Sequence, residues 1–248
     1  MKPLHEVIDE TLRVYTLVLP QTFLPAALGA LAGGIPMAMV TADMGQPPDL
    51  SKMDWSAFGW AWALQLVVSA LVQGTLLKLI AMRVRNGVEL PLAEALHAGM
   101  AMLPTMLVAT VIYAVLSIAL TFALVLPGIW MLIVCILYAP AIALEGRDAL
   151  GSLQRSRALL RGAWWRTFGL MLVTALVVML GYLLLATFVT PLANAAFGGG
   201  WPTEAALATL VGALFTPLIN ALLVVLFLDY AGREPGAAPA PPPGEIAA

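Results

Sequence analysis

Long apolar runs separated by short polar segments dominate the chain. A helix that crosses a membrane needs about 20 predominantly apolar residues. The run from 103 to 145 is too long for one crossing, and we divide it at Leu126-Pro127-Gly128, which suits a tight turn. The pattern then predicts six spans, at about 20–41, 57–79, 103–126, 127–144, 167–190 and 205–228.

Amphipathic segments precede three of these spans. Residues 3–18 place apolar side chains on one face and acidic ones on the other, and 88–102 and 149–163 show a similar pattern. The motif Leu12…Leu19-Pro20 returns as Leu96…Leu103-Pro104, which suggests an internal repeat. We therefore expect an all-α polytopic membrane protein built from three units, each an interfacial helix followed by a hairpin of two spans. Its parts are an interfacial helix at 1–19, a six-span membrane domain at 20–230 and a disordered Pro/Ala-rich tail at 231–248.

Composition supports the membrane assignment. The residues are 61% hydrophobic and 10% charged, and the mean hydropathy is +0.94, whereas soluble domains carry roughly 25% charged residues. The net charge of −2, without a basic stripe, argues against nucleic acid as a partner. Acidic residues near the N-terminus argue against a cleavable signal. The single cysteine, Cys135, excludes an intrachain disulfide.

The basic residues predict an orientation. If the N-terminus is cytoplasmic, eleven of the twelve Lys and Arg lie on or near the cytoplasmic side, and only Lys52 lies outside. The positive-inside rule therefore places both ends of the chain in the cytoplasm.

The segment 140–168 concentrates five arginines between two spans. In a helix, a ridge of small and apolar residues from Ala149 to Ala163 would pack inward, while the flanking arginines reach the headgroup layer. We hypothesise that four of them bind lipid headgroups: Arg155, Arg157, Arg161 and Arg166. The alternative is that these bases only set the orientation.

Uncharged polar side chains form stripes along three spans. Gln65, Ser69 and Gln73 repeat at helical spacing on the second span, as do Thr216 and Asn220 with Gly212 on the sixth. A third stripe holds Thr110, Ser117 and Thr121. Such residues commonly join helices through close packing and hydrogen bonds. The alternative is that they line a cavity for a polar substrate or headgroup.

The sequence lacks the usual signs of catalysis. No span carries an ionisable side chain near its centre, which also argues against an ion-coupled transporter. His5 and Asp9 share a helix face, but two ligands without a third do not make a metal site. We expect neither an enzyme nor a cofactor nor a bound metal.

Part of the chain resembles known families. The motifs are Leu-Pro-Gly at 126–128, Pro-Ala-Ile-Ala-Leu-Glu at 140–145, Ala149-Leu150…Arg155-Ser156 and Arg161-Gly162…Trp165-Arg166. They resemble the membrane domain of some bacterial glycerophosphoryl diester phosphodiesterases and the YciC-type inner-membrane proteins, over about residues 70–175. The resemblance implies a six-span domain in a bacterial cytoplasmic membrane. It does not imply phosphodiesterase activity, because neither histidine precedes the Arg-Gly of that catalytic motif.

Two functions follow from these patterns. The first is a non-enzymatic inner-membrane module that engages lipids or a partner protein in envelope or lipid homeostasis, with a protein partner or homo-oligomer left open. The second is a permease or transport component for a small polar or amphiphilic solute. A cavity joining Gln73 and Asn220 and open to one side would favour the permease, and a closed bundle with a basic collar would favour the module.

Overall fold

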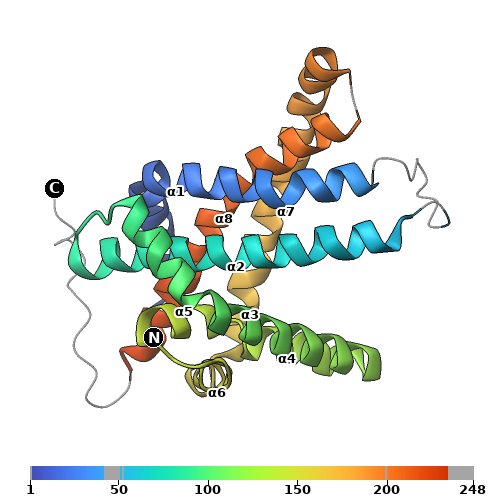
Figure 1. Cartoon of the computed structure of the whole chain (residues 1–248). Coiled ribbons are helices and arrows are strands. Elements are labelled where there is room, and N and C mark those ends of the chain that lie inside the picture. The colour runs from blue at the N-terminus through green and yellow to red at the C-terminus, as the bar shows by residue number, and fades with distance from the viewer. Residues whose placement is uncertain (1, 42–50, 52, 199, 234–248) are drawn as a thin grey trace.

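The computed structural model of the chain describes residues 2–41, 51, 53–198 and 200–233. Its helices form a bundle in which α1 and α2 run side by side and α8 crosses behind them (Figure 1). The helices are α1 (Leu4–Thr41), α2 (Trp55–Asn86), α3 (Leu92–Ala123), α4 (Val125–Val134), α5 (Tyr138–Glu145), α6 (Ala149–Leu159), α7 (Trp164–Phe197) and α8 (Trp201–Ala231).

Six segments are long and apolar enough to cross a membrane: α1, α2, α3, α4 with α5, α7 and α8. The predicted all-α membrane fold is therefore confirmed. Several helices leave large apolar side chains exposed, and α7 does so along most of its length, from Leu172 to Leu192. A lipid-facing surface accounts for this exposure, since soluble monomers rarely carry such extended apolar patches.

The prolines at the predicted starts of the first and third spans do not interrupt their helices. Pro20 lies inside α1 and Pro104 inside α3, and both helices continue through these prolines. Proline is tolerated in membrane helices because neighbouring groups satisfy the freed carbonyls. From Leu4 and from Leu92 onward, the predicted interfacial segments thus run directly into their spans within α1 and α3, and the three-unit repeat stays a prediction.

The turn between the third and fourth spans lies two residues before the predicted one. Leu124 breaks the helix with extended backbone (φ −161°, ψ 129°), and Leu126-Pro127-Gly128 forms the first turn of α4. Proline is tolerated there because the first helical N–H groups have no intrahelical partner. Gly128 is required for close packing, since a Cβ on it would overlap the backbone and side chain of Thr121 in α3.

The fourth span is interrupted between Val134 and Tyr138. Pro140 explains the break, because its ring would clash with the carbonyl four residues earlier in a continuous helix. Ser156 of α6 bridges the interruption: its hydroxyl donates to the Val134 carbonyl at 2.8 Å and accepts from the Leu137 N–H at 3.0 Å. The serine thereby satisfies backbone groups that the break leaves unpaired.

The segment 140–168 is less continuous than predicted. Gly146 (φ 66°) ends α5 and Gly162 (φ 76°) lies in the turn before α7, so that only Ala149–Leu159 forms the separate helix α6. The predicted ridge nevertheless faces the interior, with Leu153, Ser156 and Leu160 all buried.

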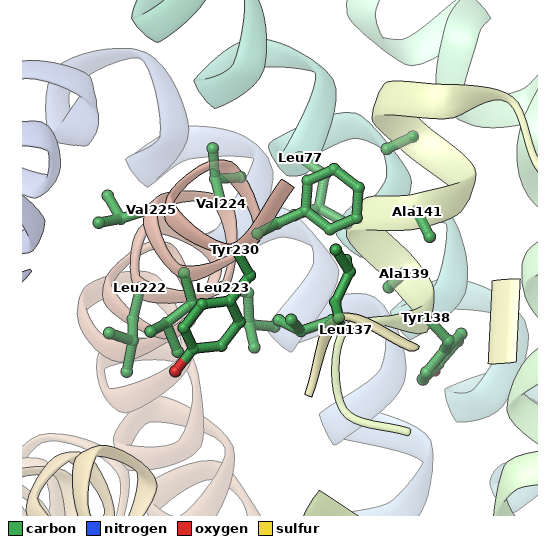
Figure 2. Close-up of a cluster of buried hydrophobic side chains, with 14 of the residues drawn as sticks. Leu77, Leu137, Tyr138, Ala139, Ala141, Leu222, Leu223, Val224, Val225 and Tyr230 are labelled. Carbon is green, nitrogen blue, oxygen red and sulfur yellow. The ribbon is translucent and has the colours of Figure 1, made fainter. Parts of the chain in front are cut away.

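The tightly packed core occupies one end of the bundle. The C-terminal half of α8 is buried on every side from Ala221 to Phe227, against Leu77 of α2 and the α5 residues Tyr138 to Ala141 (Figure 2). This end carries the first turns of α1, the last turns of α2 and α8, and α6, together with nearly all the described basic residues. We call it the basic end, and the other end, where α1 terminates and α2 and α8 begin, the opposite end.

The gaps between the predicted spans differ from the structure or lie outside it. Most of the gap between the predicted spans 167–190 and 205–228 is helical, because α7 continues through Pro191 to Phe197 and Pro202 lies in the first turn of α8. Most of the gap between the predicted spans 20–41 and 57–79, and the tail beyond residue 233, lie outside the described residues.

Candidate functional site

A cavity of about 750 Å³ lies between α1, α2 and α8, with Tyr182 of α7 at its wall. It is partly open and reaches from Thr41 and Glu204 at the opposite end to Gln73 and Asn220 near the middle of the chain's long helices. Cavities of this size accommodate drug-sized molecules.

Small residues bring the three helices close around this cavity. A Cβ on Gly29 would overlap the branched Val72 side chain, so this glycine is needed where α1 meets α2. A Cβ on Gly33 would overlap the Gln65 amide, the far end of a flexible side chain that can move away. A Cβ on Gly212 of α8 would lie 2.7 Å from the Ala30 Cβ of α1. Close approach of backbones at small residues is a usual way for membrane helices to pack.

The two predicted polar stripes converge on this cavity. Gln65, Ser69 and Gln73 line it from α2, and Thr216 and Asn220 line it from α8. No hydrogen bond joins one stripe to the other within the part of the chain that the structure describes. If the stripes only held the helices together, such bonds would be expected.

The third stripe behaves differently. Thr110 shares a hydrogen bond of 2.9 Å with the Tyr138 hydroxyl of α5, and the Thr121 hydroxyl donates to the Ser117 carbonyl within α3. None of these side chains lines the cavity. Of this stripe only Thr110 bonds to another helix, since Thr121 bonds within α3 and the buried Ser117 hydroxyl has no partner among the described residues.

Asn220 places an unsatisfied acceptor at the inner end of the cavity. Its residue is only 3% exposed, and its Nδ2 donates to the Thr216 carbonyl at 2.9 Å. Its Oδ1 has no hydrogen-bond partner among the described residues. A buried unpaired acceptor costs about 1–3 kcal/mol, but this oxygen has less than 1 Å² of accessible surface, so a ligand in the cavity reaches it only after the side chain turns.

The cavity ends where the core begins. On α2, the buried residues Gly74 to Leu77 follow directly after Gln73, and on α8 Ala221 follows directly after Asn220. The packed basic end therefore closes the inner side of the cavity in this conformation.

Glu204 is the charged residue of the lining, and the sequence reasoning did not select it. It lies exposed in the first turn of α8, and neither Lys nor Arg occurs among the described residues that line the cavity. Tyr182 was missed as well. The position of Glu204, an acidic residue at the edge of the predicted sixth span, could have singled it out. The sequence does not indicate, however, which cavity a residue at the edge of a span borders.

The structure separates the four arginines of the proposed lipid site into two pairs. Arg155 lies with its side chain 14% exposed and makes a bidentate ion pair with Glu145 at 2.9–3.0 Å. Arg166 is similarly enclosed and pairs with Asp229. Arg157 and Arg161 remain exposed, with Arg157 5.9 Å from the centre of the Trp130 ring.

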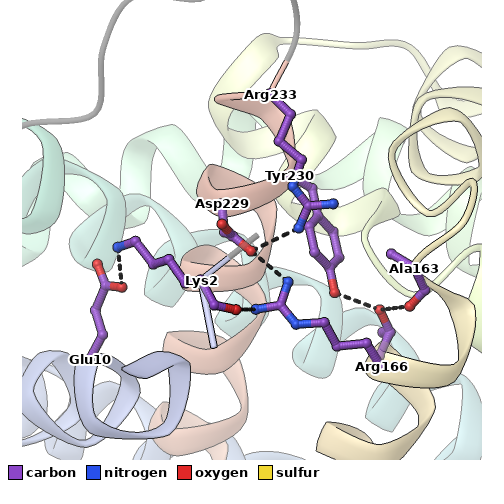
Figure 3. A network of polar contacts seen from close by, with 8 residues as sticks. Lys2, Glu10, Ala163, Arg166, Asp229, Tyr230 and Arg233 are labelled. Carbon is purple, nitrogen blue, oxygen red and sulfur yellow. Dashed lines mark hydrogen bonds and ion pairs between the residues drawn. The ribbon is translucent and has the colours of Figure 1, made fainter. Parts of the chain in front are cut away.

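A polar network ties together the chain segments at the basic end (Figure 3). The Asp229 carboxylate accepts hydrogen bonds from Arg166 at 2.8 Å and from Arg233 at 2.9 Å. Arg166 also donates to the Lys2 backbone carbonyl at 2.6 Å, and Thr167 shares a 2.9 Å hydrogen bond with the Tyr230 hydroxyl. The network joins the start of α7, the end of α8 and the N-terminus beside the packed core.

A family model described as a domain of unknown function, DUF7847, matches residues 63–233. The chain belongs to the DUF7847 family. The matched residues of this DUF7847 protein include both polar stripes of the cavity. They also include every residue described above for the polar network at the basic end except Lys2. Helix α1 lies before the matched region. No curated protein and no solved structure matches the chain.

Proposed function

We propose that this DUF7847 protein is a non-enzymatic membrane protein that binds a small polar or amphiphilic solute in the cavity between α1, α2 and α8, as a permease or transport component. The observation that supports this most is the convergence of Gln73 and Asn220 on one partly open cavity. Two stripes from distant parts of the sequence meet there, and no hydrogen bond joins them among the described residues.

The orientation belongs to the same proposal. The concentration of bases favours placing the basic end on the cytoplasmic side of a bacterial inner membrane. The cavity then opens away from the cytoplasm, and the packed core closes it on the cytoplasmic side. Passage across the membrane would require that core to open, whereas binding from the outer side requires no rearrangement.

Equilibrium binding of tritiated 1-dodecanol, a neutral amphiphile, tests the proposal. The protein in phosphatidylcholine nanodiscs should bind it saturably above the signal of empty nanodiscs. Exchanging both inner polar groups, Gln73→Leu with Asn220→Leu, should weaken the binding about tenfold, since each lost hydrogen bond contributes about 0.5–1.5 kcal/mol.

The control is Ser117→Ala, which removes a polar group from α3 outside the cavity. It should bind like the wild type. Binding that never saturates, or binding that the double variant retains in full, would argue against a ligand cavity and return the stripes to a packing role.

A second function is supported at a different place. Arg157 and Arg161 are exposed, Arg157 lies 5.9 Å from the centre of the Trp130 ring, and Trp130 and Trp165 are 44% and 78% exposed. Arginine next to aromatic residues at a membrane interface suits an anionic lipid headgroup, with about 1 kcal/mol of attraction for each base. We retain lipid engagement at this pair as the second candidate, in place of a collar of four arginines.

A further inference from the structure

The lining of the cavity carries information about the ligand beyond its being polar or amphiphilic. Two polar groups of α8 mark its ends, Glu204 at the open end and Asn220 at the inner end. Sixteen residues separate Glu204 from Asn220, which at a rise of 1.5 Å per residue is about 24 Å along the helix. The α1 and α8 sides of the wall include the small apolar residues Ala30, Ala208 and Gly212, whereas the α2 side carries the polar Gln65, Ser69 and Gln73.

Both ends call for a donor. Glu204 is an exposed acidic residue and makes no ion pair with any residue that the structure describes. Asn220 Oδ1 is a buried acceptor without a partner there. Since the described lining holds no Lys or Arg, an anionic headgroup at the open end would meet the Glu204 carboxylate with no compensating cation.

The two ends differ in the kind of donor that they accept. An ammonium group deep in the membrane beside neutral partners is costly, whereas one at the exposed Glu204 keeps water and gains a counter-ion. A neutral hydroxyl or amide suits the enclosed Asn220.

Building on the proposed function, we infer that the ligand is an amphiphilic amine. Its ammonium head pairs with Glu204, its apolar body lies along the small-residue wall of α1 and α8, and a neutral hydrogen-bonding group at its far end meets the inner polar side chains Gln73 and Asn220. The cavity selects against anionic amphiphiles of the same length.

Four probes of equal chain length separate the two ends: 12-amino-1-dodecanol, dodecylamine, 1-dodecanol and 12-hydroxydodecanoate. Binding is measured in phosphatidylcholine nanodiscs, whose zwitterionic lipid does not itself concentrate amines, with empty nanodiscs as background. The wild type should bind aminododecanol most tightly and hydroxydodecanoate about tenfold or more weaker, because the charge-assisted contact is replaced by repulsion.

Two substitutions assign the preferences to their residues. Glu204→Gln should remove the preference for the amine over the hydroxy acid and leave the preference for aminododecanol over dodecylamine. Asn220→Leu should remove the preference for aminododecanol over dodecylamine and leave the preference for the amine over the hydroxy acid. The matched control is Glu94→Gln, an exposed first-turn glutamate of α3 outside the cavity, which should change neither preference.

The outcomes distinguish this inference from the proposed function. Saturable binding of all four probes with no preference, or preferences that Glu204→Gln and Asn220→Leu leave intact, would overturn the amine assignment while the cavity remains a binding site. Saturable binding of none of the four would overturn both. Should Glu204→Gln fail to fold, Glu204→Asp serves in its place and should retain the preference for the amine.

Discussion

Replacing Asp229 with Asn should destabilise the basic end strongly. The side chain of Asp229 is 8% exposed and that of Arg166 is 12% exposed, so the ion pair is largely buried. Removing one partner of a buried ion pair costs about 3–5 kcal/mol, because the other charge is left uncompensated. Arg166 keeps its bond to the Lys2 carbonyl, and the Asn oxygen still accepts one hydrogen bond. We therefore expect Asp229→Asn to lower the free energy of unfolding by about 2–3 kcal/mol.

The assay is reversible unfolding by SDS titration in mixed micelles, with Arg233→Gln as the comparison. Arg233 is 27% exposed and pairs with Asp229 within one helix, an arrangement that contributes about 0.3–0.5 kcal/mol. A cycle combining Arg166→Gln with Asp229→Asn should show a coupling above 1 kcal/mol, in the upper range seen for contacting residues, about 0.5–3 kcal/mol. A cost for Asp229→Asn no larger than that of Arg233→Gln, without coupling to Arg166, would refute this account of the network.

Two further predictions concern helix packing and the exposed arginines. Gly128→Ala should destabilise the protein by about 1–3 kcal/mol in the same unfolding assay, because the added Cβ overlaps Thr121. The control Gly169→Ala, whose Cβ meets nothing within 4 Å, should be neutral or stabilising. Equal effects of the two substitutions would contradict the close α3–α4 contact. Replacing both Arg157 and Arg161 with Gln should reduce the phosphatidylglycerol or cardiolipin that the protein retains in native mass spectrometry. The control Arg155→Gln, which replaces an arginine that is ion-paired with Glu145, should leave the retained lipid unchanged. Unchanged lipid retention in the double variant would leave Arg157 and Arg161 as orientation signals.

The architecture was predictable because apolar run length determines it. Six runs of sufficient length had to become six spans in a bilayer, and the structure has them. The helix boundaries were less predictable, because proline has different effects at different places. Pro20 and Pro104 are absorbed within helices, Pro127 lies harmlessly in a first turn, and Pro140 breaks a span. The difference depends on which neighbour satisfies the freed backbone groups, as Ser156 does from α6.

The cavity was predictable only in part. Helical spacing placed Gln65 and Gln73 on one face of α2, and Thr216 and Asn220 on one face of α8. Whether those faces meet depends on how α1 and α8 cross, which Gly29 and Gly212 decide through close contacts that no local pattern encodes. The same limit applies to the arginines, since the carboxylates paired with Arg155 and Arg166 lie 10 and 63 residues away.

Labelling of single cysteines tests the central claim, a polar cavity reached from one side, most directly. In a Cys135→Ser background, a membrane-impermeant maleimide is applied to intact cells and, separately, to inverted membrane vesicles. Thr216→Cys, on the cavity wall, and Ala221→Cys, fully buried five residues further along α8, form the matched pair. Both should label after denaturation, which shows that each thiol is present and reactive.

The account predicts that Thr216→Cys labels rapidly in intact cells and slowly in inverted vesicles, and that Ala221→Cys labels slowly in both. Rapid labelling of Thr216→Cys in inverted vesicles alone would reverse the orientation and leave the cavity in place. Labelling of Thr216→Cys that is no faster than that of Ala221→Cys from either side would contradict the cavity itself.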